Sequence, residues 1–407
     1  MSDRSTKRES GFSLMEMMIA VALGTLVLGA AVQIYIQGVN ATWTVTQRAE
    51  MQEDFRAASD ILTKDLSLAG AGLGNGNPIP LPTGTTPIYG CDQTLACHVC
   101  TTYTSGACTQ SAAAKYPVTS GTPYLYGLLP GYDLGPTLVT AQGATDAVTV
   151  VYTDNSFYLN CYTATATAAG VITFSPALTP LVSGNPPAFP PASCLPAGVA
   201  AAQAVNDTVV GLVPGDLVMM TLNGSTVIGE VTAGTITVGA NAVGATYAVP
   251  FANSDVLKMN QTAGGKGFDT LAVGATGTAP VRVLVITYYL DSTVSPARLM
   301  RQISGHTPMP VAENIVYLKF SYDLYNSATA TPAVNCSNPG ASPDGCNTSG
   351  ASAGLTPINI TKINVLNMAI DSSQMGYQGG HQSGYQRLDL QTSVAARNLT
   401  YTNNYPN

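Results

Sequence analysis

Near its start the chain reads Gly11-Phe12-Ser13-Leu14-Met15-Glu16, followed directly by MMIAVALGTLVLGAAVQIYI. The 25 residues from Phe12 to Ile36 carry a single charge, on Glu16. A helix needs about 20 apolar residues to cross a bilayer, so this stretch predicts a transmembrane helix over residues 12–36. A carboxylate at the depth of the lipid is costly, and Glu16 is therefore a candidate functional residue.

Two simpler interpretations of this stretch explain it less well. A secretory signal peptide would use the basic residues of 1–10 as its n-region and Gly29-Ala30-Ala31 as its cleavage site. Glu16 would then lie inside the apolar region of the signal peptide, which argues against this interpretation. A plain membrane anchor explains the length of the apolar stretch but gives Gly11 and Glu16 no role.

The sequence GFSLMEMMIA resembles the processing site of type IV pilins and type II secretion pseudopilins, the class III signal. In that family a short basic leader ends in Gly, Phe usually follows, and a Glu stands five residues after the cut. The resemblance implies that a prepilin peptidase removes residues 1–11 by cleaving after Gly11 and methylates the new amine of Phe12. It also implies that Glu16 pairs with the Phe12 amine of a neighbouring subunit and fixes the axial register of assembly.

The physical chemistry of these groups agrees with such a pair. An N-terminal ammonium, whose pKa is about 7.7–8.0, stays largely charged at neutral pH. A Glu four residues further on lies on the same face of a helix. Each charge needs a partner at the depth of the lipid, because burying an unpaired charge is expensive.

Charge predicts where the chain is located. Residues 1–10 carry a net charge of +1, and basic flanks of a membrane span stay in the cytoplasm. We expect a single-pass inner-membrane protein with a cytoplasmic N-terminus and a periplasmic head, which the resemblance would later place in the pilus or at the cell surface. The sequence pI of about 4.8 argues against nucleic acid as a partner, because phosphate binding requires a basic face.

One long helix is expected to continue beyond the membrane. No proline occurs between Phe12 and Asn77, so the helix can run to Ala69, with a transmembrane half over 12–36 and an amphipathic half over 37–69. An apolar stripe at helical spacing supports the second half, consisting of Met51, Phe55, Ala58, Leu62, Leu66 and Ala69. A coiled stalk is the alternative, but it would need heptads sustained over several repeats. Gly70 and Gly72 are expected to end the helix.

The rest of the chain is predicted to be rich in β-strands. Residues 70–140 form a Gly/Pro- and Cys-rich loop insertion, and residues 141–407 form a β-rich head with a second loop insertion over 326–357. Asn223-Gly224 between two apolar runs is a strong signal for a β-hairpin with a type I′ turn. The expected strands cover residues 146–152, 170–174, 216–222, 225–232, 281–290, 297–303, 315–325, 358–370 and 387–394. The expected fold class is pilin-like α+β, with a long N-terminal transmembrane helix and a large β-rich globular head.

Several head segments resemble the PilW family of minor pilins, which is related to the GspJ-type minor pseudopilins. These segments are DILTKDLSLAG, PGDLVMMTLNGSTVIGEVT, ARLMRQI, VAENIVYLKFSYDLY and TSVAARN. The resemblance implies a minor pilin that helps to initiate type IV pilus assembly in a minor-pilin complex near the pilus tip. The implied partners are prepilin peptidase, other minor pilins, the major pilin, the inner-membrane assembly platform, a tip adhesin and membrane lipid.

Two other functions stay open at this point. A minor pseudopilin of a type II secretion system would carry the same signal, and gene neighbourhood would separate it from a pilus protein. A pilus-borne surface-binding or adhesion module would use the long insertions. Within the resemblance, members at the extreme tip lack the glutamate, so Glu16 implies a place below the tip.

Eight cysteines follow the membrane span, in what should be an oxidising compartment, so disulfides are expected. Cys336 and Cys346 bracket a Pro/Gly/Asn-rich loop and are the first expected pair, and Cys161 with Cys194 is the second. The remaining four cysteines are Cys91, Cys97, Cys100 and Cys108, and they allow three different pairings.

Metal, cofactor and catalytic chemistry are not expected. Cys97 and Cys100 have CxxC spacing, but a zinc ribbon needs a second such pair, and Thr101 stands where a c-type haem needs His. The oxygen-rich segment 335–349 does not match the calcium loop of an EF-hand. The three histidines are isolated, and no GxSxG, HExxH or P-loop pattern occurs, so we expect a protein that is not an enzyme.

Overall fold

The computed structural model describes residues 13–73, 78–82, 102–104, 107–109, 118–119, 122–176, 203–222, 225–241, 244–255, 257–260, 268, 272–303, 305–326, 331–339, 356–371 and 387–399. The chain divides into two units. The first unit is residues 1–53 with 372–386, and the second is residues 54–371 with 387–407. Each is described by itself.

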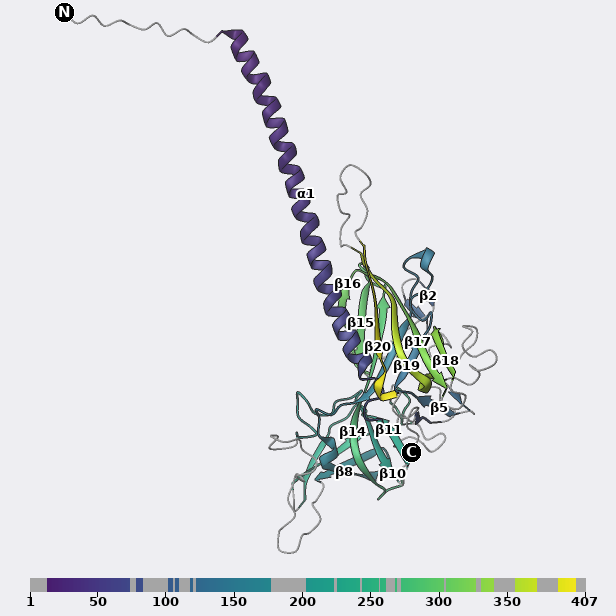
Figure 1. Cartoon of the computed structure of the whole chain (residues 1–407). Helices are drawn as coiled ribbons and strands as arrows, with labels where there is room; N and C mark the ends of the chain where they lie inside the picture. Colours follow the sequence, from purple (N-terminus) through teal and green to yellow (C-terminus); the bar gives the residue numbers. More distant parts are fainter. Residues whose placement is uncertain are drawn as a thin grey trace, which may run out of the picture. The chain divides into compact units, whose positions relative to one another are not determined.

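The helix α1 runs without interruption from Leu14 to Ser67 (Figure 1, purple). Its 54 residues correspond to about 81 Å at 1.5 Å per residue. The absence of proline from this stretch leaves every helical N–H available, as the sequence predicts. The helix therefore ends within two residues of the expected boundary.

Two glycines turn the chain after α1. Gly70 and Gly72 have φ angles of 78° and 74°, in the left-handed region that glycine adopts without a steric penalty. The N–H of Gly70 donates to the carbonyl of Val151 at 2.8 Å. At Gly72 a Cβ atom would lie 1.9 Å from Oγ1 of Thr153. Both the backbone conformation and the lack of space require glycine here.

Residues 54–67 of α1 belong to the second unit and pack against its sheet. The side chains of the predicted stripe from Phe55 onward are all buried. Burying a Leu or Phe side chain stabilises a fold by about 1.5–3 kcal/mol, so this stripe holds the end of α1 in place.

The strand β14, Thr276–Asp291, is the centre of the main sheet, which has 11 strands among the described residues. It pairs antiparallel with β7, β8, β10 and β15. The other strands of this sheet are β6 (Leu128–Gly131), β7 (Ala147–Thr153), β8 (Tyr162–Ala168), β9 (Val171–Pro176), β10 (Leu217–Leu222), β11 (Ser225–Glu230), β12 (Thr237–Ala240), β13 (Ala245–Pro250), β15 (Arg298–Ile303) and β16 (Met309–Glu313). Short 3-10 helices occur at Thr140–Gln142, Leu159–Cys161 and Pro357–Asn359.

Two hydrophobic cores lie on opposite faces of this sheet. Successive side chains of a strand point to opposite faces, and β10 shows the consequence directly. Leu217 and Met219 belong to one core, whereas Val218 and Met220 belong to the other. β10 is therefore covered on both faces, which explains its continuous apolar sequence LVMMTL.

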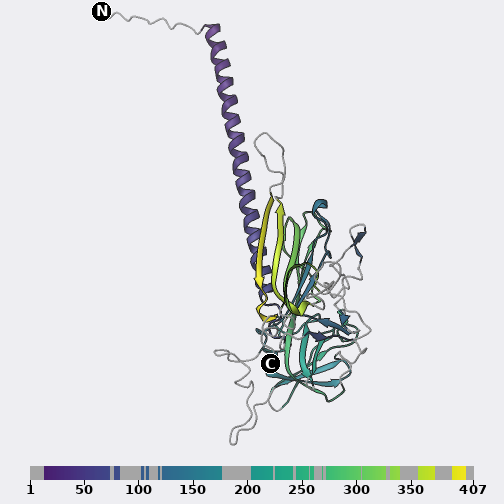
Figure 2. The same ribbon diagram turned by 45° about the vertical axis from the view of Figure 1, so that its right-hand side comes forward.

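A second sheet has the strand order β18-β17-β19-β20. Its strands are Thr331–Cys336, Ile315–Asn326, Ile360–Asp371 and Arg387–Ala395, and the green to yellow members lie side by side in Figure 2. Asp146, directly before β7, joins the two sheets. Its carboxylate accepts hydrogen bonds from the N–H of Phe320 at 2.9 Å and from Nζ of Lys319 at 2.7 Å. Burial raises the pKa of Asp146, and the Lys319 charge opposes that shift.

Most predicted strands are confirmed, but the two segments predicted as loop insertions also contain strands. Segment 70–140 holds β1 (Ile79–Pro80), β2 (Thr102–Thr104), β3 (Ala107–Thr109), β4 (Val118–Thr119), β5 (Thr122–Leu125) and β6. β6 pairs with β7 of the main sheet, and segment 326–357 contains β18. Pairing stabilises these short strands in spite of their Gly and Pro content, either within local hairpins (β2 with β3, β4 with β5) or with a strand further along the chain (β1 with β5, β6 with β7). The pairing of Leu222 with Ser225 confirms the predicted hairpin, whereas its turn residues lie outside the described ones.

Candidate functional site

The first turn of α1 contains the candidate residue Glu16. Ser13 precedes the first helical residue, and its Oγ accepts a hydrogen bond from the N–H of Met15 at 3.4 Å. The N–H of Ser13 donates to Oε2 of Glu16, also at 3.4 Å. This arrangement resembles a capping box, except that Ser13 binds the N–H of the second helical residue instead of the third, and the two side chains satisfy N–H groups that the helix leaves free. The S-x-x-E spacing could have revealed this role of Ser13, which the sequence analysis missed.

The carboxylate of Glu16 therefore has a partner within its own helix. A negative charge in the first turn also interacts favourably with the helix dipole, by about 0.3–1 kcal/mol at exposed sites. Both interactions reduce the cost of holding Glu16 in an apolar segment. Gly11 and Phe12, the predicted cleavage site and methylated amine, lie outside the described residues.

The helix beyond Glu16 presents apolar side chains on all sides. Large side chains such as Leu14, Leu26 and Ile34 are each more than two-thirds exposed. The 31 residues from Met17 to Gln47 carry no charge. Of the helices in the described part of the chain, α1 is the one long and apolar enough to cross a membrane. An exposed apolar surface of this size needs lipid or protein to cover it.

Residues 6–32 match the family model of the prokaryotic N-terminal methylation motif. The methylation motif includes Gly11, Phe12 and Glu16, and it indicates a protein of the type IV pilin and pseudopilin kind. Motifs of this type are processed by prepilin peptidase, and pilins assemble with other pilins. The apolar helix is consistent with single-pass membrane anchoring. Neither the curated proteins nor the solved structures include a match to the chain.

The second unit contains a buried polar cluster around Asp65, near the end of α1. Oδ2 of Asp65 accepts hydrogen bonds from the Tyr288 hydroxyl at 2.6 Å and from Nε of Arg301 at 2.8 Å. Oδ1 accepts one from the Tyr152 hydroxyl at 3.1 Å. The cluster thus connects α1 to β7, β14 and β15. No motif marks it in the sequence, because the partners of Asp65 lie 87 to 236 residues from it.

The electrostatics of this cluster keep its two tyrosines protonated and its arginine charged. Burial and the Asp65 charge raise the pKa values of Tyr152 and Tyr288 well above their ordinary range. Burial opposes the charge on Arg301, but its hydrogen bond to Asp65 and the Asp65 charge raise the pKa of the guanidinium overall. The arrangement therefore suits a permanent structural contact.

A further ion-pair cluster surrounds Arg282 on β14. Its guanidinium pairs with Asp154 at 2.5 Å and approaches Asp216 at 3.7 Å. Asp216 also contacts Nε2 of His306 at 3.0 Å. Hydrogen bonds from Ser156 and Arg282 lower the pKa of Asp154 in spite of its burial. His306 is isolated in the sequence, but in the folded chain it contacts Asp216 within this cluster.

Two of the eight cysteines fall among the described side chains. Cys161 and Cys336 are fully buried and disulfide-bonded. The side chains of Cys91, Cys97, Cys100, Cys108, Cys194 and Cys346 lie outside the described residues, so the pairings Cys161–Cys194 and Cys336–Cys346 stay predictions. No group of three or more His, Cys, Asp or Glu side chains suited to a metal ion occurs in the part of the chain that the structure describes.

Proposed function

We propose that the chain is a minor pilin that takes part in initiating type IV pilus assembly within a complex of minor pilins near the pilus tip. The observation that carries this proposal is the methylation motif at residues 6–32, which leads into a continuous helix with Glu16 in its first turn. The β-rich second unit adds a head with buried cores on both faces of its main sheet. The proposed role is structural rather than catalytic.

The proposed assembly step depends on Glu16. In the monomer its carboxylate accepts the N–H of Ser13, a weak interaction at 3.4 Å. A methylated ammonium on Phe12 of a neighbouring subunit would offer a full positive charge instead. The carboxylate attracts a full opposite charge more strongly than a neutral N–H, above all where the surroundings are apolar, so assembly would replace the cap with a stronger pair.

The test is Glu16→Ala in the native strain, with Glu50→Ala as the matched control on an exposed site of the same helix. Removing a carboxylate favours residence in the membrane by up to about 2.5–3.5 kcal/mol but removes the assembly pair. We expect Glu16→Ala to be processed and abundant in membranes, with few surface pili and weak co-purification with partner pilins. Glu50→Ala should behave as the wild type.

A deletion strain separates a pilus protein from a pseudopilin. Piliation and secretion of type II substrates are measured side by side in a deletion strain. Loss of pili with intact secretion supports the proposal. Loss of secretion with normal pili contradicts it and assigns the chain to a type II secretion system.

A further inference from the structure

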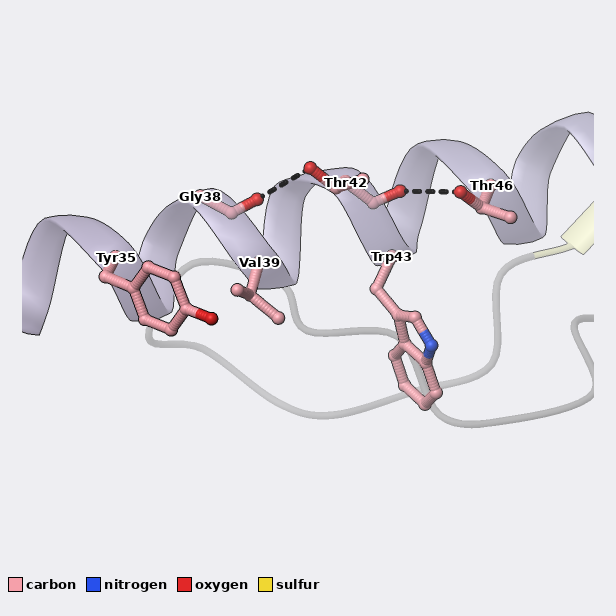
Figure 3. Close-up of a pocket in the computed structure, with 6 residues that line it drawn as sticks. All are labelled: Tyr35, Gly38, Val39, Thr42, Trp43 and Thr46. Carbon is pink, nitrogen blue, oxygen red and sulfur yellow. Dashed lines mark hydrogen bonds between the residues drawn. The ribbon is translucent and has the colours of Figure 1, made fainter.

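Two aromatic side chains and a valine form a stripe along the second half of the exposed part of α1. Tyr35, Val39 and Trp43 recur every four residues, and their exposed fractions are 72%, 48% and 47%. Figure 3 shows the three side chains on the same side of the helix, with the Tyr35 hydroxyl leaning toward Val39. Together with neighbouring small residues they line a shallow groove of about 380 Å³.

The polar groups beside this stripe are already satisfied within the helix. The Thr42 hydroxyl donates to the carbonyl of Gly38 at 2.9 Å, and the Thr46 hydroxyl donates to that of Thr42 at 3.0 Å (Figure 3). Thr44 bonds to Asn40 in the same way at 2.9 Å. Hydroxyl groups satisfied like this can enter a partly apolar environment at little cost.

The position of the stripe matches the thickness of a bilayer. Tyr35 follows Glu16 by 19 residues, or about 29 Å of helix, which equals the hydrocarbon core of about 30 Å. Trp43 follows Glu16 by 27 residues, or about 40 Å, which matches the thickness of about 40–45 Å that a bilayer has with both headgroup layers included. With Glu16 in one headgroup layer, Trp43 lies in the opposite headgroup layer, and Tyr35, about 12 Å before Trp43, lies inside the hydrocarbon near its far edge.

The composition of α1 changes at the same place. From Met17 to Ile36 nearly every residue is apolar, whereas residues 37–47 (QGVNATWTVTQ) mix uncharged polar and apolar side chains. Charged residues return only at Arg48. Tyr and Trp are enriched at membrane–water interfaces because their rings combine an apolar body with a polar edge.

We propose that the Tyr35–Val39–Trp43 stripe is an anchor for the phospholipid interface and fixes the depth of α1 in the membrane. Tyr35 lies inside the hydrocarbon near its far edge, and Trp43 binds among the headgroups. The anchor thereby sets the depth of Glu16 in the opposite headgroup layer. This inference concerns the membrane-resident chain and is independent of whether the chain builds a pilus or a pseudopilus.

Trp43 is the single tryptophan of the chain, so its fluorescence reports the depth of the stripe. The full-length protein is reconstituted into phosphatidylcholine–phosphatidylglycerol vesicles containing lipids brominated either near the headgroup or near the end of the acyl chains. We expect blue-shifted emission and a larger loss of intensity with the shallow bromine. Emission as in water without quenching, or stronger quenching by the deep bromine, would overturn the proposal. The double variant Trp43→Phe with Thr25→Trp calibrates the deep position.

A matched pair of variants tests whether the stripe fixes the depth. Tyr35→Ser removes the inner aromatic ring, whereas Val45→Ser makes a comparable change to a side chain that is 68% exposed on another face. We expect Tyr35→Ser to shift Trp43 emission to the red and to reduce shallow quenching, and Val45→Ser to leave both unchanged. Equal changes in Trp43 emission and quenching in the two variants would contradict the proposal, because the length of the apolar segment alone would then set the depth. Shallow quenching that disappears when partner pilins are co-reconstituted would identify a protein helix as the occupant instead.

Discussion

Asp65 is a single carboxylate that connects one helix to three strands. It is buried, and its three partners contribute two hydroxyl groups and one guanidinium. Removing one partner of a buried ion pair typically costs more than the pair contributes, because the remaining charge is left without compensation.

We expect Asp65→Asn to destabilise the second unit by about 2–3 kcal/mol, below the 3–5 kcal/mol typical of deep pairs, because the Arg301 side chain is 25% exposed. The measurement is urea unfolding of the full chain in detergent. Asp60→Asn, on an exposed position of the same helix, is the control. If Asp65→Asn and Asp60→Asn both lower the free energy of unfolding only slightly, the cluster contributes little to stability. The double variant Asp65→Asn with Arg301→Met should recover part of the loss, because it removes the uncompensated charge.

The buried hydroxyl of Tyr162 predicts a dependence of stability on alkaline pH. Burial raises its pKa from 10.0 to about 12, so the unfolded chain loses this proton before the folded chain does. The stabilisation is complete below pH 10 and is lost as the pH rises toward 12. We expect Tyr162→Phe to lose less stability over this range than the wild type. Below pH 10 the free energy of unfolding of the variant should be lower than that of the wild type by a constant amount, about 0.5–1.5 kcal/mol. This difference reflects the lost hydrogen bond from the Tyr162 hydroxyl to the Gln203 carbonyl. Urea midpoints measured across the range check both parts, and parallel curves would refute the assignment.

At the scale of elements, the turn after α1 separates two effects of glycine. Gly72 and Gly143 have similar φ angles of 74° and 78°. A Cβ at Gly72 would overlap the Thr153 side chain, whereas nothing lies within 4 Å of one at Gly143. Gly143 has a ψ of −166°, in a region essentially restricted to glycine, so Gly143→Ala should cost about 1–3 kcal/mol from backbone strain alone. Gly72→Ala should cost clearly more, because β7 or the turn must shift. Equal unfolding midpoints for the two variants would contradict this account.

The elements that the sequence predicts well are those with a strong apolar pattern. α1 lacks proline and has a helical stripe from Phe55 onward. β7, β10 and β14 are dense in Val, Ile, Leu and Met because both of their faces meet buried side chains. At the N-terminus, the spacing of Gly11 and Glu16 identifies the methylation motif that the comparison finds.

Other elements have no such local signal. β8 reads YTATATA, and its buried positions are Tyr162, Ala164 and Ala166, which are small or amphipathic. β12 is exposed at every position, so burial leaves no pattern in its sequence. The Asp65 cluster depends on sheet register between distant strands, which pattern alone does not provide. Tertiary pairing decides these features.

At the scale of the whole molecule, processing is expected to remove residues 1–11 and raise the net negative charge of the mature chain from −7 by one. Gly11→Leu places a bulky side chain at the expected cleavage site and should leave a chain heavier by the leader. Intact-mass measurement of membrane-extracted protein checks this, with Gly29→Leu as a control at a glycine that has no contact within 4 Å. Cleavage near Ala31 in the wild type would instead identify a secretory signal peptide.

The cluster at Asp65 also has a mechanical consequence. Tension transmitted along α1 enters the second unit through residues 54–67, close to Asp65. Its hydrogen bonds reach β7, β14 and β15, which are neighbours in one sheet. A pulling force is therefore shared among bonds that must rupture together rather than one after another. Under load the end of α1 should stay bound to the sheet, and the chain should unfold first elsewhere.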